Sequence, residues 1–263
     1  MPAFSSGTPP QDLHRIIRPN GLHYEHHDAG VPAVDPDNHR LLIHGLVDRP
    51  LIVTMDDILR FPSISKIHLL GCSGNRPEYR GSKPACTRQD THGLSTYCKS
   101  TGVPLRRKRG YALRLFLPGF EGNMSVKWLR RPSSVTSRVK RMNLHRSTYL
   151  IPNRIPPQFT SVMEAKSVIT GRADEQLRDP GFHEIIGLAW TAGGRIRRVG
   201  ISTDGGRPWD AATLQEPILW GCLTRFRLLW TWDGGSALSQ SRAVDETRYV
   251  RQPHGAPGRC APG

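Results

Sequence analysis

The chain has 263 residues, enough for one large domain or two smaller ones, and no apolar run is long enough to cross a membrane. Its 37 Lys and Arg outnumber 22 Asp and Glu, which gives a net charge of +15. Such a charge indicates either an anionic partner, such as nucleic acid, an acidic protein or an oxyanion, or a merely solvated basic surface, with about even odds. The 26 Gly and 22 Pro favour a turn-rich, mainly β protein, and the five Cys form no CxxC pair, which excludes the usual zinc-ribbon signature.

Residues 1–20 are predicted to be a loose leader, and they contain no apolar core typical of a signal peptide. The segment LLIHGLV at 41–47 predicts a strand. Thr54 is a suitable N-cap for a helix that follows it, because Asp56 and Asp57 fall in the first turn. The segment SKIHLLGC then predicts a buried strand that ends at Cys72.

Residues 76–110 show many turn residues and little periodicity, whereas 110–131 predict strands on both sides of an LPGFEGN turn. Residues 132–158, rich in Ser, Arg and Pro, are predicted to be an irregular linker. From 159 onward, short strands and Gly-rich turns indicate a two-sheet sandwich. The strand TRFRLLWTW alternates, with Arg225 and Arg227 on one face and its apolar residues on the other: Phe226, Leu228, Trp230 and Trp232.

Cys72 is a lone thiol at the point where a strand gives way to a loop. A cysteine is more often a small buried hydrophobe than a functional group. The functional interpretation is a thiolate near His68 and Arg76, acting as a nucleophile or as a soft metal ligand. Because no zinc-type partners lie at ligand spacing, a metal bound here would have to bring most of its own ligands.

Several basic groups have both a structural and a functional interpretation. Arg114 and Lys127, on the strands that flank LPGFEGN, are either outward-facing charges or a pair that recognises an oxyanion. The histidines of HYEHH, including His26 and His27, bind a metal or lie in a solvated loop. The run RRKR at 106–109 is a basic patch or a solvated loop.

Together these segments resemble the sulfite oxidase family of molybdopterin oxidoreductases, and most closely its bacterial sulfite or sulfane dehydrogenase branch. The resemblance covers most of residues 20–250, in order. It is carried by LLIHGLVDRPLIVTMDDILRFPS, GCSGN, THGL, TGVPL, GYALRLFLPGFEGNMSVKWLRR, FTSVMEAKSVIT, GLAW, RRVGISTDGGRPW, LQEP and LTRFRLLWTWDGG.

The resemblance implies an α+β, mainly β fold: a shortened molybdopterin-binding domain at 21–131, an immunoglobulin-like dimerisation sandwich at 159–250 and a tail at 251–263. It implies a molybdenum-molybdopterin cofactor and the oxidation of sulfite or protein-bound sulfane sulfur by oxo transfer. A cytochrome c would accept the electrons. The family also implies a homodimer and a periplasmic location, although no export signal is visible in this chain.

For individual residues, the resemblance implies that Cys72 binds the metal. One protein thiolate suffices because the cofactor supplies further sulfurs. Arg114 and Lys127 would hold the pterin and its phosphate. Ser125 and Val126 would bring their backbone close to the cofactor.

For the remaining site residues, fewer of the flanking positions in the sequence match the family. His26 and His27 occupy the N-terminal loop where the family has an arginine followed by a histidine or asparagine, so that arginine is lost here. Arg76 is a candidate contact for the substrate anion, because the family has an arginine close after this turn. Tyr149 lies near the spacing of the family's active-site tyrosine.

Three stretches depart from the family pattern. TGVPL joins GYALR through only RRKR, where the family has a long segment, and both 132–157 and the C-terminus differ from it. We therefore expect an internally deleted and C-terminally altered chain. One alternative is a catalytically inactive remnant that retains the sandwich. Another is a basic nucleic-acid-binding module, disfavoured because no basic stripe with interleaved aromatics is present.

Overall fold

The computed structural model describes most of the chain, and every structural statement below concerns the described part. That part comprises 16, 30–62, 64, 66–71, 103–134, 162–170 and 179–248, and the backbone alone of 4–6, 25–27, 89–91, 96–97, 99–100, 103–104, 123 and 134. The contacts divide the chain into two units, Met1–Met163 and Glu164–Gly263. The boundaries predicted from the sequence stay a prediction. No helix in the described part is both long and apolar enough to span a bilayer.

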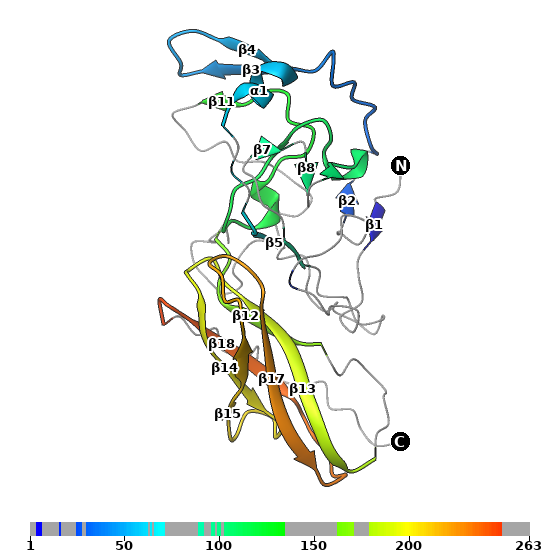
Figure 1. The fold of residues 1–263 in the computed structure, drawn as a ribbon, viewed down its shortest axis with the longest axis vertical. Helices are drawn as coiled ribbons and strands as arrows, with labels where there is room; N and C mark the ends of the chain where they lie inside the picture. Colours follow the sequence, from blue (N-terminus) through cyan, green and yellow to red (C-terminus); the bar gives the residue numbers. More distant parts are fainter. Residues whose placement is uncertain are drawn as a thin grey trace, which may run out of the picture. The chain divides into compact units, whose positions relative to one another are not determined.

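The first unit consists of short strands and one α-helix (Figure 1). Its elements are β1 (Phe4–Ser6), β2 (Glu25–His27), β3 (Arg40–Gly45), β4 (Leu51–Thr54), α1 (Met55–Arg60), β5 (Leu69–Gly71), β6 (Gln89–Thr91), β7 (Thr96–Tyr97), β8 (Lys99–Ser100), β9 (Val103–Pro104), η3 (Arg107–Arg109), β10 (Arg114–Leu115), η4 (Gly122–Met124) and β11 (Ser133–Ser134).

The predicted strand at 41–47 is present as β3, which pairs antiparallel with β4 and parallel with β11. The inner face of this sheet packs on a core that includes Leu41, Met55 and Leu113. This core also contains Leu129, which follows the LPGFEGN turn. The sheet and the predicted hairpin therefore share one hydrophobic core.

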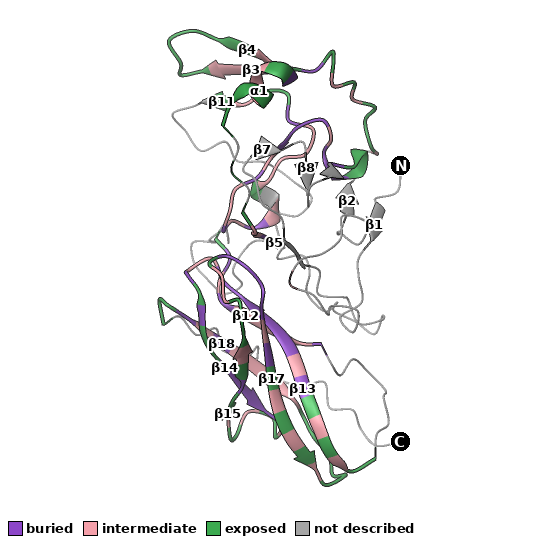
Figure 2. Cartoon of the chain, viewed as in Figure 1, coloured by how far each residue is buried: buried purple, intermediate pink, exposed green. Residues whose placement is uncertain are grey.

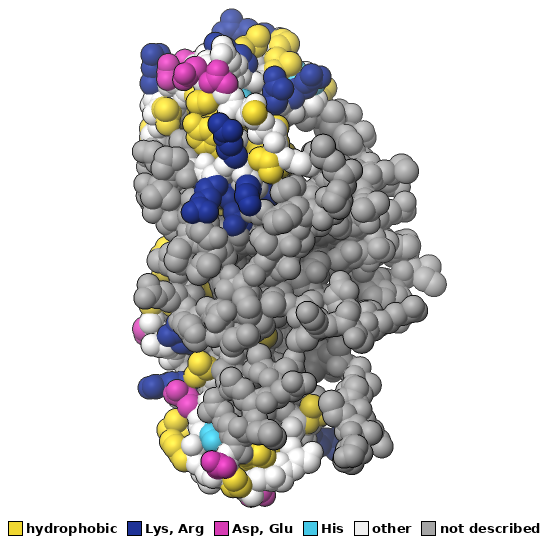
Figure 3. All heavy atoms as spheres, turned by 90° about the vertical axis from the view of Figure 1, so that its right-hand side faces the viewer, with side chains coloured by type: hydrophobic (Ala, Val, Ile, Leu, Met, Phe, Trp, Pro, Cys, Tyr) yellow, Lys and Arg dark blue, Asp and Glu magenta, His cyan; other side chains and the backbone are white. Residues whose placement is uncertain are grey.

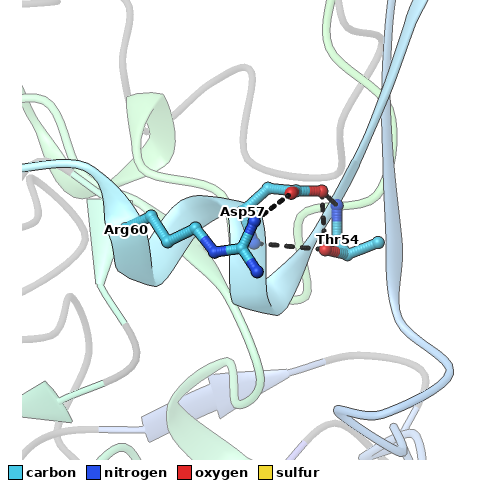
Figure 4. A network of polar contacts seen from close by, with 3 residues as sticks. All are labelled: Thr54, Asp57 and Arg60. Atoms are coloured by element: carbon cyan, nitrogen blue, oxygen red, sulfur yellow. Dashed lines mark hydrogen bonds and ion pairs between the residues drawn. The ribbon is translucent and has the colours of Figure 1, made fainter.

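The predicted helix cap at Thr54 is confirmed. The Thr54 hydroxyl accepts a hydrogen bond from the Asp57 amide at 3.1 Å, and the Asp57 carboxylate accepts one from the Thr54 amide at 2.9 Å (Figure 4). These reciprocal bonds form a capping box, which satisfies backbone donors that a helix start leaves open. Arg60 lies 3.9 Å from the other Asp57 oxygen.

The second unit contains two facing sheets, as the sequence predicts for 159–250. One sheet has the order β12-β13-β17-β16 and the other β15-β14-β18. The strands are β12 (Lys166–Ile169), β13 (Gly181–Trp190), β14 (Ile196–Ser202), β15 (Asp210–Ala211), β16 (Thr213–Gln215), β17 (Thr224–Trp232) and β18 (Gln240–Asp245).

The two sheets of the second unit meet in one core, formed by Ile185 and Phe226 from the first sheet and Val199 and Ala243 from the second. The predicted alternation along β17 is confirmed, because Leu228 and Trp230 pack against this core while Arg227 is exposed. Figure 2 shows that β13 and β17 are buried at one end and more exposed at the other.

Candidate functional site

The strand that leads to Cys72 is buried. All three residues of β5 are inaccessible or nearly so, and Leu70 packs with Leu105 and Phe116. A side chain added at Gly71 would come within 2.8 Å of the Met163 sulfur, so this position has no room for one. The strand is shorter than the predicted 65–72, since Lys66–His68 are not in a strand. Cys72 itself lies outside the described residues.

Arg114 and Lys127 are brought opposite each other by a pair of backbone hydrogen bonds. The Leu115 amide donates to the Val126 carbonyl at 2.9 Å, and the Val126 amide donates to the Leu115 carbonyl at 3.0 Å. In an antiparallel pair this register places the residue before Leu115 across from the residue after Val126, and neighbouring side chains on one face lie close together. Arg114 is only 4% exposed and Lys127 is half-buried. The sequence prediction that both flank one turn is therefore confirmed.

The turn before this hairpin is fastened to both cations. The Arg114 Nη1 atom donates a hydrogen bond to the Arg109 carbonyl at 3.1 Å. Gly110 has φ +110°, and a Cβ built there would stand 3.0 Å from the Lys127 Cα and 3.4 Å from the Arg114 Cβ. Only glycine fits a positive φ with so close a backbone approach. Gly110 thus permits the contact between the turn and the cation pair.

Trp128 ties the same turn to the hairpin from the other side. Its indole Nε1 donates to the Arg107 carbonyl at 2.9 Å, and the Lys127 ammonium lies 5.5 Å from the centroid of its ring. A cation at that distance from an aromatic face is attracted to it. Trp128 takes a positive φ of 51°, which is uncommon for a large residue and places the ring over the turn.

The cations of η3, the Arg106 residue at its N-cap and the cations of the hairpin form one group, which we call the basic turn–hairpin cluster: Arg106, Arg107, Lys108, Arg109, Arg114 and Lys127. Arg109 is 3% exposed, whereas Arg106, Arg107 and Lys108 are exposed. Figure 3 shows Lys and Arg side chains gathered on the surface of the first unit. Guanidinium and ammonium groups in this arrangement suit a phosphate or another oxyanion.

The other predicted site residues are placed only in part. The Ser125 hydroxyl accepts a hydrogen bond from the Leu117 amide at 3.4 Å, and Val126 carries the backbone pairing already described. The backbone of His26 and His27 belongs to β2, which pairs with β1, but their side chains lie outside the described residues.

Arg76 and Tyr149 also lie outside the described residues. Their assigned roles stay predictions, as does that of Cys72.

Near the hairpin of the first unit, the sequence analysis missed two buried charged residues. Arg109 belongs to a run read as a basic patch or solvated loop, and Glu121, in the LPGFEGN turn, is 2% exposed. Neither lies in a periodic segment, so no pattern marked it as buried. The one available signal was Gly110, directly after Arg109, since a glycine that ends a helical turn often has positive φ and brings its neighbours close to other backbone.

Two family models match the chain, and together they define a molybdopterin-type oxidoreductase with a dimerisation domain. The oxidoreductase molybdopterin binding domain matches 28–107 and 94–141. The Mo-co oxidoreductase dimerisation domain matches 158–257. The basic turn–hairpin cluster lies within the first match, and the two-sheet unit lies within the second.

Individual relatives agree with these domains. The crystal structure of the sulfane dehydrogenase SoxCD from Paracoccus pantotrophus superposes with a TM-score of 0.82 and 32% identity, over 93% of this chain and 77% of that one. The mitochondrial sulfite oxidase of Macaca fascicularis is 25% identical, and the match covers 87% of this chain but 54% of that protein. The NADH nitrate reductase of Volvox carteri is also 25% identical, over 79% of this chain and 34% of that protein.

The chain belongs to the sulfite oxidase family, as its sequence predicts. It spans about half the length of the curated sulfite oxidases that it matches. The alignment with the macaque protein runs over 302 positions, more than the 263 residues of this chain, so the relative carries segments absent here. This agrees with the predicted internal shortening.

The described residues fit the cofactor of this family in their chemistry. Molybdopterin carries a phosphate, and the buried Arg109 and Arg114 with half-buried Lys127 are the donors that such a group requires. The cluster is thus suited to hold the pterin phosphate.

Proposed function

We propose that this chain is a molybdenum-dependent oxidoreductase that oxidises sulfite or protein-bound sulfane sulfur and passes the electrons to a cytochrome c. The observation that carries the proposal is the opposed pair of Arg114 and Lys127, held by paired backbone inside the matched molybdopterin-binding domain. When bound, the molybdenum cofactor supplies the two-electron oxidation of sulfur, with the added oxygen drawn from water.

The protein's own residues bind and orient the cofactor. Arg114 and Lys127 hold the pterin phosphate, and the Arg109 guanidinium adds a third cation. The backbone carbonyl of Arg109 accepts a hydrogen bond from the Arg114 guanidinium and so fixes its position. The backbone of Ser125 and Val126 borders the same group. Cys72 directly follows the buried strand β5 in the sequence, and its thiolate is the protein ligand of the metal in this proposal.

The roles assigned to the remaining residues concern the substrate side. Arg76 neutralises the charge of an approaching sulfur oxyanion, because a guanidinium matches its oxygens. Tyr149 donates a hydrogen bond to the same anion, and His26 and His27 border the cofactor. The second unit pairs two copies into a homodimer, in keeping with the matched dimerisation domain, and the resemblance to the bacterial sulfane dehydrogenase is the basis for a periplasmic location.

The test is to express the chain in a host that makes the cofactor and to measure bound pterin by the fluorescence of its oxidation product. Arg114→Ala and Lys127→Ala should each lower the pterin content, because each removes a cation from the phosphate. Arg130→Ala is the matched control, since Arg130 is an exposed arginine on the segment that follows the hairpin. It should leave the pterin content unchanged.

Catalysis is tested on the same preparation by sulfite-dependent reduction of cytochrome c. We expect turnover by the pterin-loaded chain and loss of turnover in Arg76→Ala with the pterin retained. Folded chain that contains no pterin would contradict the proposal and would identify the protein as an inactive remnant of the family. Equal pterin content in Arg114→Ala, Lys127→Ala and Arg130→Ala would contradict the assigned cation roles.

A further inference from the structure

The proposed cofactor site uses only part of the basic turn–hairpin cluster. Arg106, Arg107 and Lys108, which we call the exposed turn cations, face solvent, whereas the pterin phosphate is assigned to the buried and half-buried members of the cluster. Among the described residues, no acidic side chain forms an ion pair with Arg106 or Arg107. Their guanidinium groups are therefore open to a partner outside the chain.

The backbone that carries these side chains is fixed. The Arg106 carbonyl accepts a hydrogen bond from the Arg109 amide at 2.8 Å. The Arg107 carbonyl accepts one from the Gly110 amide at 3.1 Å and another from the Trp128 indole at 2.9 Å. A partner that contacts this turn does not have to order its backbone first, and ordering of loops is one of the main costs of binding.

The charge around the turn is almost entirely positive. Residues 103–134 contain eight Lys and Arg against one acid, Glu121, and that acid is 2% exposed. Figure 3 shows Lys and Arg side chains on the surface of this unit. A surface with charges of one sign attracts a partner of the opposite sign and speeds its association.

We propose that the exposed turn cations are a docking surface for a protein partner with a compact acidic patch. Successive side chains leave a 3₁₀ turn about 120° apart, so these three do not converge on one small anion. They are suited instead to meet separate carboxylates on a facing protein surface, and a guanidinium binds a carboxylate through two parallel hydrogen bonds. This docking is a function beyond cofactor binding, because it uses other cations of the cluster.

A nucleic acid or a lipid surface fits the turn less well. The exposed turn cations occupy one short turn, whereas nucleic-acid-binding proteins carry their cations in a longer patch or stripe. Trp128 is engaged within the chain, because its Nε1 donates to the Arg107 carbonyl and the Lys127 ammonium lies 5.5 Å from its ring centroid. The neighbouring apolar side chain, Leu105, is 4% exposed and does not reach a lipid layer.

The test measures binding of the pterin-loaded chain to two forms of one probe, by biolayer interferometry. The probe is lysozyme, used either unmodified and basic or with succinylated lysines and therefore acidic. Only the acidic form should bind. Arg106→Glu/Arg107→Glu should raise its dissociation constant about tenfold or more, because like charges then face each other.

A matched control separates the turn from the net charge of the chain. Arg49→Glu/Arg198→Glu changes the net charge equally at two exposed arginines, one between β3 and β4 and the other on β14. It should leave the dissociation constant nearly unchanged. Arg106→Lys/Arg107→Lys keeps the charge and loses the forked hydrogen bonds, so it should weaken binding less than the glutamate variant. Circular dichroism checks that each variant is folded.

The outcomes distinguish this inference from the proposed function. Equal weakening by the two glutamate variants would overturn the docking surface, because net charge alone would then explain the binding. A short DNA duplex or phosphatidylserine vesicles that bind more tightly than the acidic probe, and lose binding in Arg106→Glu/Arg107→Glu, would also overturn it. So would loss of bound pterin in that variant, which would assign these cations to the cofactor. A pterin-free chain that binds the acidic probe as expected would overturn the proposed function and leave the docking surface intact.

Discussion

Replacing Gly110 with alanine should disturb both the stability of the first unit and its cofactor site. Gly110 has φ +110°, and an added Cβ would stand 3.0 Å from the Lys127 Cα, a backbone atom that cannot swing aside. The positive φ costs an L-residue about 1–2 kcal/mol, and overpacking adds about 1–3 kcal/mol. Of a total stability of about 5–15 kcal/mol, the change removes about 2–5 kcal/mol.

The same Cβ also pushes on the cation pair, because it would stand 3.1 Å from the Lys127 Cβ. The expected result is a lower unfolding midpoint in urea for the first unit and a lower molybdenum content in the folded protein. Gly205→Ala is the matched control. Gly205 has φ +66° but meets only the Leu238 side chain, at 3.4 Å, so it should show the backbone cost alone and full molybdenum content.

A Gly110→Ala protein with the stability and molybdenum content of Gly205→Ala would refute the role of Gly110. That result would mean that the turn and the hairpin can separate without consequence. Differential scanning calorimetry on both variants resolves the transitions of the two units, so a change confined to the first unit is measured directly.

Three further predictions follow from single sites. Burial, followed by repulsion from Arg130 and Arg40, lowers the pKa of His39 from 6.5. As the pH falls, the unfolded chain therefore takes up the proton first. The contribution of His39 to the free energy of unfolding should be full above about pH 6.5 and fall as the pH drops toward the folded-state pKa, with a shallower fall in His39→Gln. Burial raises the pKa of the Cys222 thiol to about 11, so iodoacetamide at neutral pH should leave it unmodified until the protein is denatured, as peptide mass spectrometry would show. Thr54→Ala should cost about 1 kcal/mol in urea unfolding and Thr54→Ser much less, whereas equal losses would contradict the capping role.

Features that depend on local chemistry were predictable from the sequence. The Thr54 cap rests on residues three positions apart, and the alternation of β17 rests on a period of two. The flanking of one turn by Arg114 and Lys127 was equally visible, because both sit in short apolar stretches on either side of it.

Features that depend on contacts between distant segments were not predictable. The burial of Arg109 depends on the Trp128 indole, 21 positions away from Arg107, and on the close approach of Gly110 to Lys127. The short extent of β5 depends on its partner β6, which lies in a segment with no periodicity. Nor does the period of β17 reveal that Leu229 on its outer face is exposed beside Phe182 of another strand.

The most direct test of the central claim is the molybdenum content per chain, measured by mass spectrometry of the metal in protein from a cofactor-producing host. We expect close to one molybdenum per chain in the wild type and a large loss in Cys72→Ser. Cys222→Ser should keep its molybdenum, because the Cys222 thiol is buried in the second unit. Folded wild-type protein without molybdenum, or equal molybdenum in Cys72→Ser, would contradict the central claim.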